Sequence, residues 1–250
     1  MLEKTLNLPG PDGEIPLFVT CPEREGPHPV VIFYMDAPGI REELRDMARR
    51  IATVGYYVVM PNLWYRWGGI SFTTNNRPAA EQEKMMGLLK ELTNEKVLSD
   101  TRVMLDWIKA QPEAAKSPMG CIGYCMSGQF VISIMGTMPE QFLAGASLHG
   151  VGNITDKPDS PHLLADRISG ELYFGFAEDD PHVPLSEVDA LGKVLKAKGV
   201  AHEIEVHPGT LHGFVFPERA CYVKEASERQ WERVFSLFRR RLAGAAARAA

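Results

Sequence analysis

The sequence predicts an α/β protein, with a mostly parallel central sheet and helices on both faces, as one domain over residues 1–250. Short runs of β-branched and aromatic residues alternate with longer segments of helical period, the order of a parallel sheet with crossover helices. The run Val30–Tyr34 is apolar at every position, as expected of a strand buried on both faces. Residues 2–8 and 14–20 flank a Pro-Gly-Pro-Asp-Gly turn, so we expect an antiparallel hairpin at the sheet edge.

The segment after this first strand predicts a helix and then a second buried strand. Within 41–54, apolar residues recur at i, i+3, i+4, i+7 and i+8 from Leu44, which gives the helix one apolar face. Gly55 suits the left-handed C-terminal cap of that helix. The strand 56–60 follows and ends at Pro61.

The rest of the chain repeats this alternation after one long connection. Residues 64–78 have no period and carry Trp, Tyr, Arg, paired Gly and Asn, so we expect a loop that shapes a binding site. An apolar stripe from Trp231 to Leu242 predicts the last helix, and the Ala-rich tail 243–250 is expected to fray. The remaining predicted elements are helices at 99–110 (capped by Ser99 or Asp100), 126–137 and 185–198, and strands at 119–122, 143–148, 171–176 and 201–206.

Composition and charge exclude several classes of protein. The chain has 27 Lys and Arg against 32 Asp and Glu, a net charge of −5, whereas a nucleic-acid binder would carry a basic face. No apolar run approaches the roughly 20 residues that a membrane helix needs. The N-terminus lacks the apolar segment and cleavage site of a secretory signal. We therefore expect a cytoplasmic protein that binds neither nucleic acid nor membrane, while the oligomeric state stays open.

The four cysteines predict free thiols. Cys21, Cys121, Cys125 and Cys221 are too sparse for a disulfide framework, and no Cys-x-x-Cys pair is present for zinc or dithiol chemistry. In a reducing compartment most of them are expected to be small buried side chains. We expect neither a metal nor an organic cofactor.

Cys125 is the exception, because it lies at the centre of a strand-to-helix turn lined by small residues. Residues 123–127 read Gly-Tyr-Cys-Met-Ser, the Gly-x-Ser-x-Gly nucleophile elbow with Cys in place of its Ser and Ser127 as the second small residue. Such a turn is so tight that only small side chains fit two residues before and after the nucleophile. It presents the sulfur at the positive end of the next helix, which favours the thiolate. It also aims the Met126 amide at the same space, where this amide can bind an oxyanion.

Two alternatives to a nucleophilic Cys125 are open from the residues alone. Ser127 could be the nucleophile, although its neighbours two residues away, Cys125 and Gln129, are too large for a tight elbow. Cys125 could also be an ordinary buried thiol. The small residues on both sides favour Cys125 as the nucleophile.

The same motif predicts an acid and then a histidine, each on a loop after a later strand. His212, in Gly-Thr-Leu-His-Gly-Phe, follows the last predicted strand and is the preferred base among the seven histidines. The acid is expected among the three adjacent carboxylates at 178–180. A carboxylate beside His212 would hold its tautomer and stabilise the imidazolium. Asp180 is the preferred acid and Asp179 the alternative, since periodicity cannot choose between them.

These residues resemble a known family. The Cys125 elbow, the Asp-x-x-Val-Pro stretch at 180–184 and His212-Gly-Phe are similar to the dienelactone hydrolase (carboxymethylenebutenolidase) family of α/β hydrolases. Asp-Ala-Pro-Gly-Ile at 36–40 and Gly-Tyr-Tyr-Val-Val-Met-Pro-Asn-Leu at 55–63 resemble further segments of that family. The resemblance covers residues 29–242 and implies an α/β-hydrolase fold.

The resemblance also implies the roles of the central residues. It implies Cys125 as nucleophile, Asp180 as triad acid and His212 as base. The backbone amides of Met126 and Ala37 would then form the oxyanion hole. The expected reaction is acyl transfer, in which the Cys125 thiolate attacks an ester or lactone carbonyl and His212 activates the water that cleaves the thioester.

The resemblance assigns further residues to the thiol and the substrate. Asp36 stands where the family has a Glu that contacts the resting thiol, and Asp is one methylene shorter. The family holds its substrate carboxylate with arginines, one of them four residues after the catalytic His. Here that position is Phe216, and the first basic residue beyond it is Arg219. Arg66 is the expected substitute for the other arginine, and an ordinary surface arginine is the alternative. Trp64, two residues before it, is also expected to contact the substrate.

The expected partner is a small ester or lactone. Hydrolysis of a different small ester or thioester is the first alternative function. A non-catalytic protein that binds a small ligand, or senses oxidants through Cys125, is the second.

Overall fold

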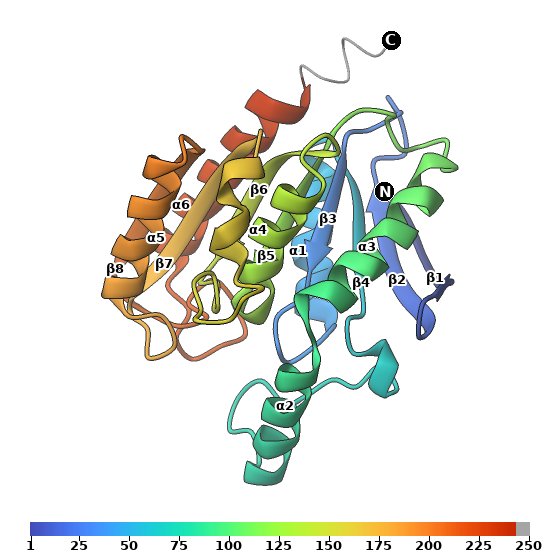
Figure 1. Cartoon of the computed structure of the whole chain (residues 1–250). Helices are drawn as coiled ribbons and strands as arrows, with labels where there is room; N and C mark the ends of the chain where they lie inside the picture. Colours follow the sequence, from blue (N-terminus) through green and yellow to red (C-terminus); the bar gives the residue numbers. More distant parts are fainter. Residues whose placement is uncertain (244–250) are drawn as a thin grey trace.

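The computed structural model describes residues 1–243, and its centre is an eight-stranded sheet (Figure 1). The strand order is β1-β2-β4-β3-β5-β6-β7-β8. The hairpin strand β2 pairs antiparallel with β1 and with β4, and every other pair of neighbours is parallel. The strands are β1 (Leu2–Gly10), β2 (Gly13–Cys21), β3 (Val30–Tyr34), β4 (Tyr57–Pro61), β5 (Met119–Tyr124), β6 (Phe142–Leu148), β7 (Glu171–Asp179) and β8 (Ala201–Leu211).

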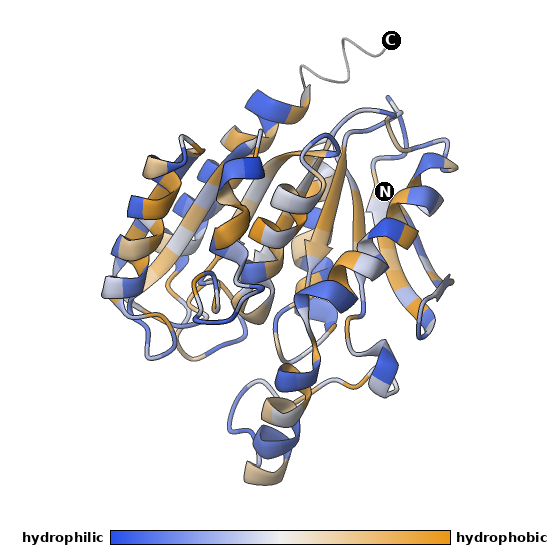
Figure 2. Ribbon diagram, in the orientation of Figure 1, coloured by the Kyte–Doolittle hydropathy of each residue, from blue (hydrophilic) through white to orange (hydrophobic). Residues whose placement is uncertain are grey.

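Helices cover both faces of the sheet, which confirms the predicted α/β architecture. Helices α1 and α6 lie on one face and α3, α4 and α5 on the other, while α2 extends below the sheet in the view of Figure 1. Figure 2 shows apolar strands between helices whose outer sides are hydrophilic. The helices are α1 (Glu42–Thr53), α2 (Ala79–Glu91), α3 (Asn94–Lys109), α4 (Gly128–Thr137), α5 (Leu185–Ala197) and α6 (Lys224–Phe238), with short turns η1 (Tyr65–Trp67), η2 (Cys125–Ser127), η3 (Pro161–Arg167) and η4 (Arg239–Ala243).

The elements predicted from strong periodicity are confirmed. The strand Val30–Tyr34 has the predicted bounds and is buried at all five positions. The apolar face of α1 is buried from Leu44 to Ala52, and Gly55 follows with a φ of 103°. The predicted hairpin forms the sheet edge, with Leu2 opposite Cys21. Within residues 1–243 no helix combines the length and apolar composition needed to cross a bilayer. The predicted frayed tail, apart from Ala243, lies outside the described residues.

The region between β4 and β5 differs from the prediction. An unpredicted helix, α2, follows the long connection, and it buries only Met85 and Leu88, too few apolar residues to give a clear period. Helix α3 begins at Asn94 rather than near 99, because the Thr93 side chain accepts a hydrogen bond from the Lys96 amide as its N-cap. The predicted cap Asp100 is instead a buried residue inside this helix.

The last two strands are longer than predicted, and their extension matters for the site. β7 continues to Asp179 and β8 to Leu211, and these two residues pair across a local irregularity of the ladder. Asp180 and His212 therefore leave adjacent parallel strands at the same edge of the sheet. This pairing brings a carboxylate and an imidazole together although 32 residues separate them.

Two glycines allow the turn between β5 and α4 to close. A side chain at Gly123 would overlap the carbonyl group of Ser127. A side chain at Gly128 would overlap the backbone of Gly150, which lies in the turn after β6. Small residues are thus required both inside this turn and where it packs against its neighbour.

We expect Gly123→Ala to destabilise the protein by about 1–3 kcal/mol or more, because the new methyl group has no room beside the Ser127 carbonyl. Gly87→Ala is the matched control, since that position of α2 has open space and Ala favours a helix by about 0.5–1 kcal/mol. Urea unfolding measures both. Equal unfolding free energies for Gly123→Ala and the unmodified protein would show that the turn is looser than described.

Candidate active site

Cys125 lies in a strained backbone conformation between β5 and α4. Its φ is 52°, in the left-handed region that non-glycine residues rarely adopt. Its side chain is partly exposed, whereas Cys121 on the preceding strand is fully buried. Strained residues of this kind concentrate at functional sites, because the surrounding structure must hold them in place.

Two hydrogen bonds hold the turn at Cys125. The Cys125 carbonyl accepts a hydrogen bond from the Val151 amide at 3.0 Å, which ties the turn to the loop after β6. The hydroxyl of Ser127 is fully buried and donates to the Met35 carbonyl at 2.5 Å, which ties it to the end of β3. Ser127 therefore has a structural partner for its hydroxyl, and its side chain has no access to solvent.

His212 and Asp180 form a buried pair at the ends of β8 and β7. Nδ1 of His212 lies 2.7 Å from Oδ2 of Asp180, and the Asp180 side chain is fully buried. The other oxygen of Asp180 accepts a hydrogen bond from the His182 amide at 2.9 Å. Asp179 is exposed. The contact with His212 thus belongs to Asp180, the preferred of the two acids.

The charge on His212 depends on its neighbours. Burial lowers the pKa of this imidazole, but the Cys125 sulfur and the hydrogen-bonded Asp180 carboxylate raise it by more, to about 10. Nε2 of His212 is buried and makes no hydrogen bond within residues 1–243, and the Cys125 sulfur lies within electrostatic range of the ring. The raised pKa therefore favours the protonated form of His212 at neutral pH.

Asp36 has partners other than the expected thiol. Its fully buried carboxylate accepts hydrogen bonds from Arg41 at 2.7 and 3.2 Å and from Arg219 at 2.6 Å. Both oxygens are thus held by guanidinium groups, and no hydrogen bond joins Asp36 to Cys125 in the part of the chain that the structure describes. A buried carboxylate needs partners of opposite charge, and the two guanidinium groups supply them. The Asp36 side chain therefore binds the arginines.

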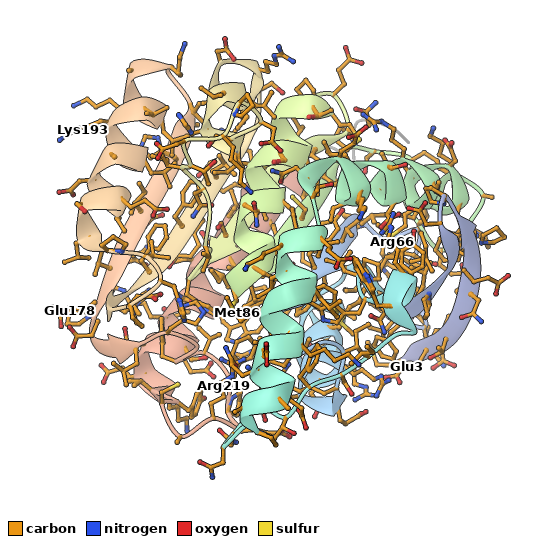
Figure 3. The ribbon with its side chains drawn as sticks, turned by 60° about the horizontal axis from the view of Figure 1, so that its bottom comes forward. Glu3, Arg66, Met86, Glu178, Lys193 and Arg219 are labelled. Carbon is orange, nitrogen blue, oxygen red and sulfur yellow. The ribbon has the colours of Figure 1, made fainter. Side chains whose placement is uncertain are left out.

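Arg66 does not reach the site, which corrects its predicted role in binding substrate. Its guanidinium pairs with Asp100 of α3 and with Asp12 of the β1–β2 turn, each at 2.7 Å, and its side chain is 6% exposed. In Figure 3, Arg66 and Arg219 lie on opposite sides of α2. Asp12 and Asp100 come from elements distant from Arg66 in sequence, so no local sequence pattern could predict these ion pairs.

Trp64 supports the site from inside the core. It is fully buried, so it has no surface to offer a substrate, and its predicted contact with one is also corrected. Its indole Nε1 donates a hydrogen bond to the Ala37 carbonyl at 2.9 Å. Ala37 is further held by its neighbours, since the Gly39 amide donates to the Asp36 carbonyl at 3.1 Å. The Ala37 amide itself donates no backbone hydrogen bond within residues 1–243.

Sequence reasoning named Arg219 only as the first basic residue after Phe216, and it missed Arg77 near Cys125. Arg219 lies across the Phe216 ring, with its guanidinium carbon 4.4 Å from the ring centre. Arg77, from the long connection before α2, has its pKa lowered by burial and by the charge of Arg219, while Asp36 and the Cys125 sulfur among others oppose this shift. Arg77 is thus within electrostatic range of the thiol. Only its position in an aperiodic loop could have indicated it.

No metal-binding arrangement is found near these residues. In the described part of the chain, no three His, Cys, Asp or Glu side chains are grouped so that they could hold a metal ion.

The sheet, the strained turn and the His–Asp pair at the carboxyl edge define the α/β-hydrolase class, in which nucleophile, acid and histidine follow in this chain order. The chain belongs to the dienelactone hydrolase family, whose family model matches residues 15–242. It is therefore a hydrolase of carboxylic esters or lactones.

Curated relatives and solved structures agree with this assignment. A "Putative carboxymethylenebutenolidase" of Synechocystis sp. is 28% identical over 240 residues, which cover 95% of this chain and 96% of the relative. Another of Methylorubrum extorquens is 25% identical over 237 residues, covering 94% of this chain and 79% of the relative. The crystal structure of a "Putative Dienelactone Hydrolase" from Klebsiella pneumoniae has a TM-score of 0.84 at 22% identity, over 95% of this chain and 98% of that chain.

We expect the pKa of His212 to fall from about 10 in Cys125→Ala, because the interactions with sulfur are lost while burial still lowers it. An NMR titration of the His212 ring measures this change. Cys221→Ala is the matched control, since the Cys221 sulfur contacts the His212 backbone carbonyl at 3.5 Å and not its ring. An unchanged His212 titration in Cys125→Ala would mean that the sulfur and the imidazole do not interact in solution.

Proposed function

We propose that this protein hydrolyses small esters or lactones through an acyl-thioester on Cys125. One observation carries the proposal: Cys125, the residue of the strained turn 123–128 that is not buried, lies within electrostatic range of a histidine that a buried carboxylate orients. An imidazolium beside the sulfur favours the thiolate, which is the nucleophilic form. Asp180 orients the ring through Nδ1, and in neutral His212 it favours the tautomer with the proton on that nitrogen.

The first half of the proposed reaction forms the thioester. The Cys125 thiolate attacks the carbonyl carbon, and the carbonyl oxygen becomes an oxyanion. The tetrahedral intermediate then expels the leaving oxygen, which takes the Nε2 proton of the His212 imidazolium and departs as an alcohol or enol. In a lactone this leaving group stays attached to the acyl chain.

The second half returns the enzyme to its starting state. Neutral His212 takes a proton from water as the water oxygen attacks the thioester carbonyl. The Cys125 thiolate leaves, and the product is a carboxylic acid. The imidazolium–thiolate pair is restored without a net change in the protein.

Two backbone amides are proposed to bind the oxyanion. Met126 follows the nucleophile at the beginning of the turn into α4, where amides are unpaired and the helix end is positive. Ala37 contributes from the end of β3, where Trp64 holds its carbonyl. Loss of one such donor lowers transition-state binding by roughly 3–4 kcal/mol in related chemistry.

We expect Cys125→Ala to abolish turnover of activated esters and small lactones, whereas Ser127→Ala keeps most of it because the Ser127 hydroxyl donates to Met35. Steady-state kinetics on both variants measure this. Mass spectrometry of the enzyme with a slowly turned-over ester should show an acyl adduct on the peptide that contains Cys125. A protein that only binds its ligand would form no adduct, and the reverse pattern in the two variants would make Ser127 the nucleophile.

We further propose that the substrate carries a carboxylate. Arg77 donates hydrogen bonds to the Thr73 carbonyl and the Gln82 side chain, and it forms no ion pair in the described residues. Its positive charge therefore has no direct carboxylate partner, although it lies within electrostatic range of Cys125. The carboxymethylenebutenolidases similar to this chain are named for a lactone that bears a carboxylate.

We expect Arg77→Gln to raise KM for a carboxylate-bearing lactone on the order of tenfold, because a hydrogen bond to a charged group contributes about 1.5–3 kcal/mol. KM for a neutral lactone of similar size should stay within about twofold, since loss of a charge contact affects only the charged substrate. Arg102→Gln, on the exposed side of α3, is the matched control. If both substrates lose affinity equally in Arg77→Gln, the arginine supports the loop and does not select for charge.

A further inference from the structure

His149 is a buried histidine beside the candidate active site, and the proposed mechanism does not use it. It directly follows β6, its φ is 38°, and it is fully buried. Its amide donates to the Gly175 carbonyl of β7 at 2.6 Å. Two residues later, the Val151 amide binds the Cys125 carbonyl. The turn that carries His149 is thus attached both to the strand that leads to Asp180 and to the nucleophile.

The His149 ring packs against the base. Its centre lies 4.8 Å from that of His212, with the two planes at 81°. Other rings complete its surroundings, with Phe216 at 5.5 Å, Tyr124 at 6.0 Å and Phe214 at 6.4 Å. The contact with His212 is the shortest of the four and has an edge-to-face geometry.

His149 is held in its neutral form. Burial, followed by the positive charges of His212 and Arg219, keeps its pKa well below the usual range. Neither ring nitrogen has a hydrogen-bond partner among residues 1–243, so no carboxylate stabilises a proton there. The His149 ring therefore places no second positive charge beside His212.

The groups that face His212 come from four parts of the chain. Cys125 comes from the elbow, Asp180 from the end of β7, and Arg219 packs its guanidinium against Gly213, the next residue along the chain. His182 lies 4.9 Å from the His212 ring at 78°, but it is exposed, so water screens its interaction. His149, in contrast, is fully buried, so water does not screen its contact with the His212 ring.

We propose that His149 is a positioning residue, which fixes the His212 ring and stabilises its protonated form through this edge-to-face contact. The inference rests on the proposed roles of Cys125 and His212. A neutral aromatic ring offers its electron-rich face to a cation, and this attraction is stronger where water is excluded. Stabilising the imidazolium also stabilises the thiolate beside it, so removal of the ring moves thiolate formation to higher pH.

The test follows alkylation of Cys125 by iodoacetamide as a function of pH, because only the thiolate reacts. His149→Asn and His149→Gly remove the ring, and both residues tolerate the left-handed backbone at this position. His149→Phe keeps a ring. Near-ultraviolet circular dichroism shows which variants are folded. One folded variant without the ring, His149→Asn or His149→Gly, is enough for the test.

We expect the pH midpoint of alkylation to rise by about half to one pH unit in the ring-free variants. At pH values well below the midpoint, this shift corresponds to an alkylation rate that is about three- to tenfold lower. His149→Phe should recover more than half of this shift. His182→Asn is the matched control, and its shift should be less than half that of His149→Asn. A simple packing role would lower stability and leave the midpoint unchanged.

Two results would overturn the inference. One is an unchanged midpoint in a folded ring-free variant, and the other is a shift in His149→Phe as large as in His149→Asn. Its failure is distinguishable from failure of the proposed function, because Cys125→Ala is tested alongside. If Cys125→Ala still hydrolyses esters, the proposed function fails, whereas an essential Cys125 with an unchanged midpoint removes only the role of His149.

Discussion

The left-handed backbone at Cys125 is the constraint on which the rest of the site depends. A residue with a side chain stays in this region only if its surroundings hold it there, at a cost on the order of 1–3 kcal/mol. Here the support comes from three directions. Gly123 allows the chain to double back, Ser127 bonds to the end of β3, and Val151 bonds to the Cys125 carbonyl. The turn is therefore rigid because neighbouring strands hold it, and the sulfur has a defined place before any substrate arrives.

Charge is distributed around the sulfur in two separate groups. Asp180 and His212 form the first, in which the Asp180 carboxylate and the Cys125 sulfur raise the pKa of the imidazole to about 10 against the effect of burial. Asp36, Arg41 and Arg219 form the second, in which one buried carboxylate is bound by two guanidiniums that also lie over the Phe216 ring. This second group holds the backbone next to Ala37. In the proposed reaction the first group activates the thiol, and the second fixes the backbone beside Ala37.

Elements set by local signals were predictable from the sequence, whereas contacts between distant residues were not. The buried strand Val30–Tyr34, helix α1 and the elbow around Cys125 were predictable, because each depends on the size and polarity of residues close in sequence. Arg66 was placed in the wrong environment because its partners, Asp100 and Asp12, come from elements far along the chain. Helix α2 was missed because its few buried residues leave no apolar period. The expected chain order of nucleophile, acid and histidine gives no role to His149, which precedes the acid, and this order says nothing of the ring that His149 contacts.

The sequence by itself determined the class of the fold, the small residues of the elbow, and a short set of candidates for nucleophile, acid and base. These follow from steric and periodic rules that act over a few residues. The tertiary structure alone decided that Asp180 and not Asp179 meets His212, that Asp36 binds two arginines, and that the His149 imidazole packs beside His212. Those outcomes depend on strand register and on which charges meet inside the folded chain, where a shift of one residue turns a side chain to the opposite side.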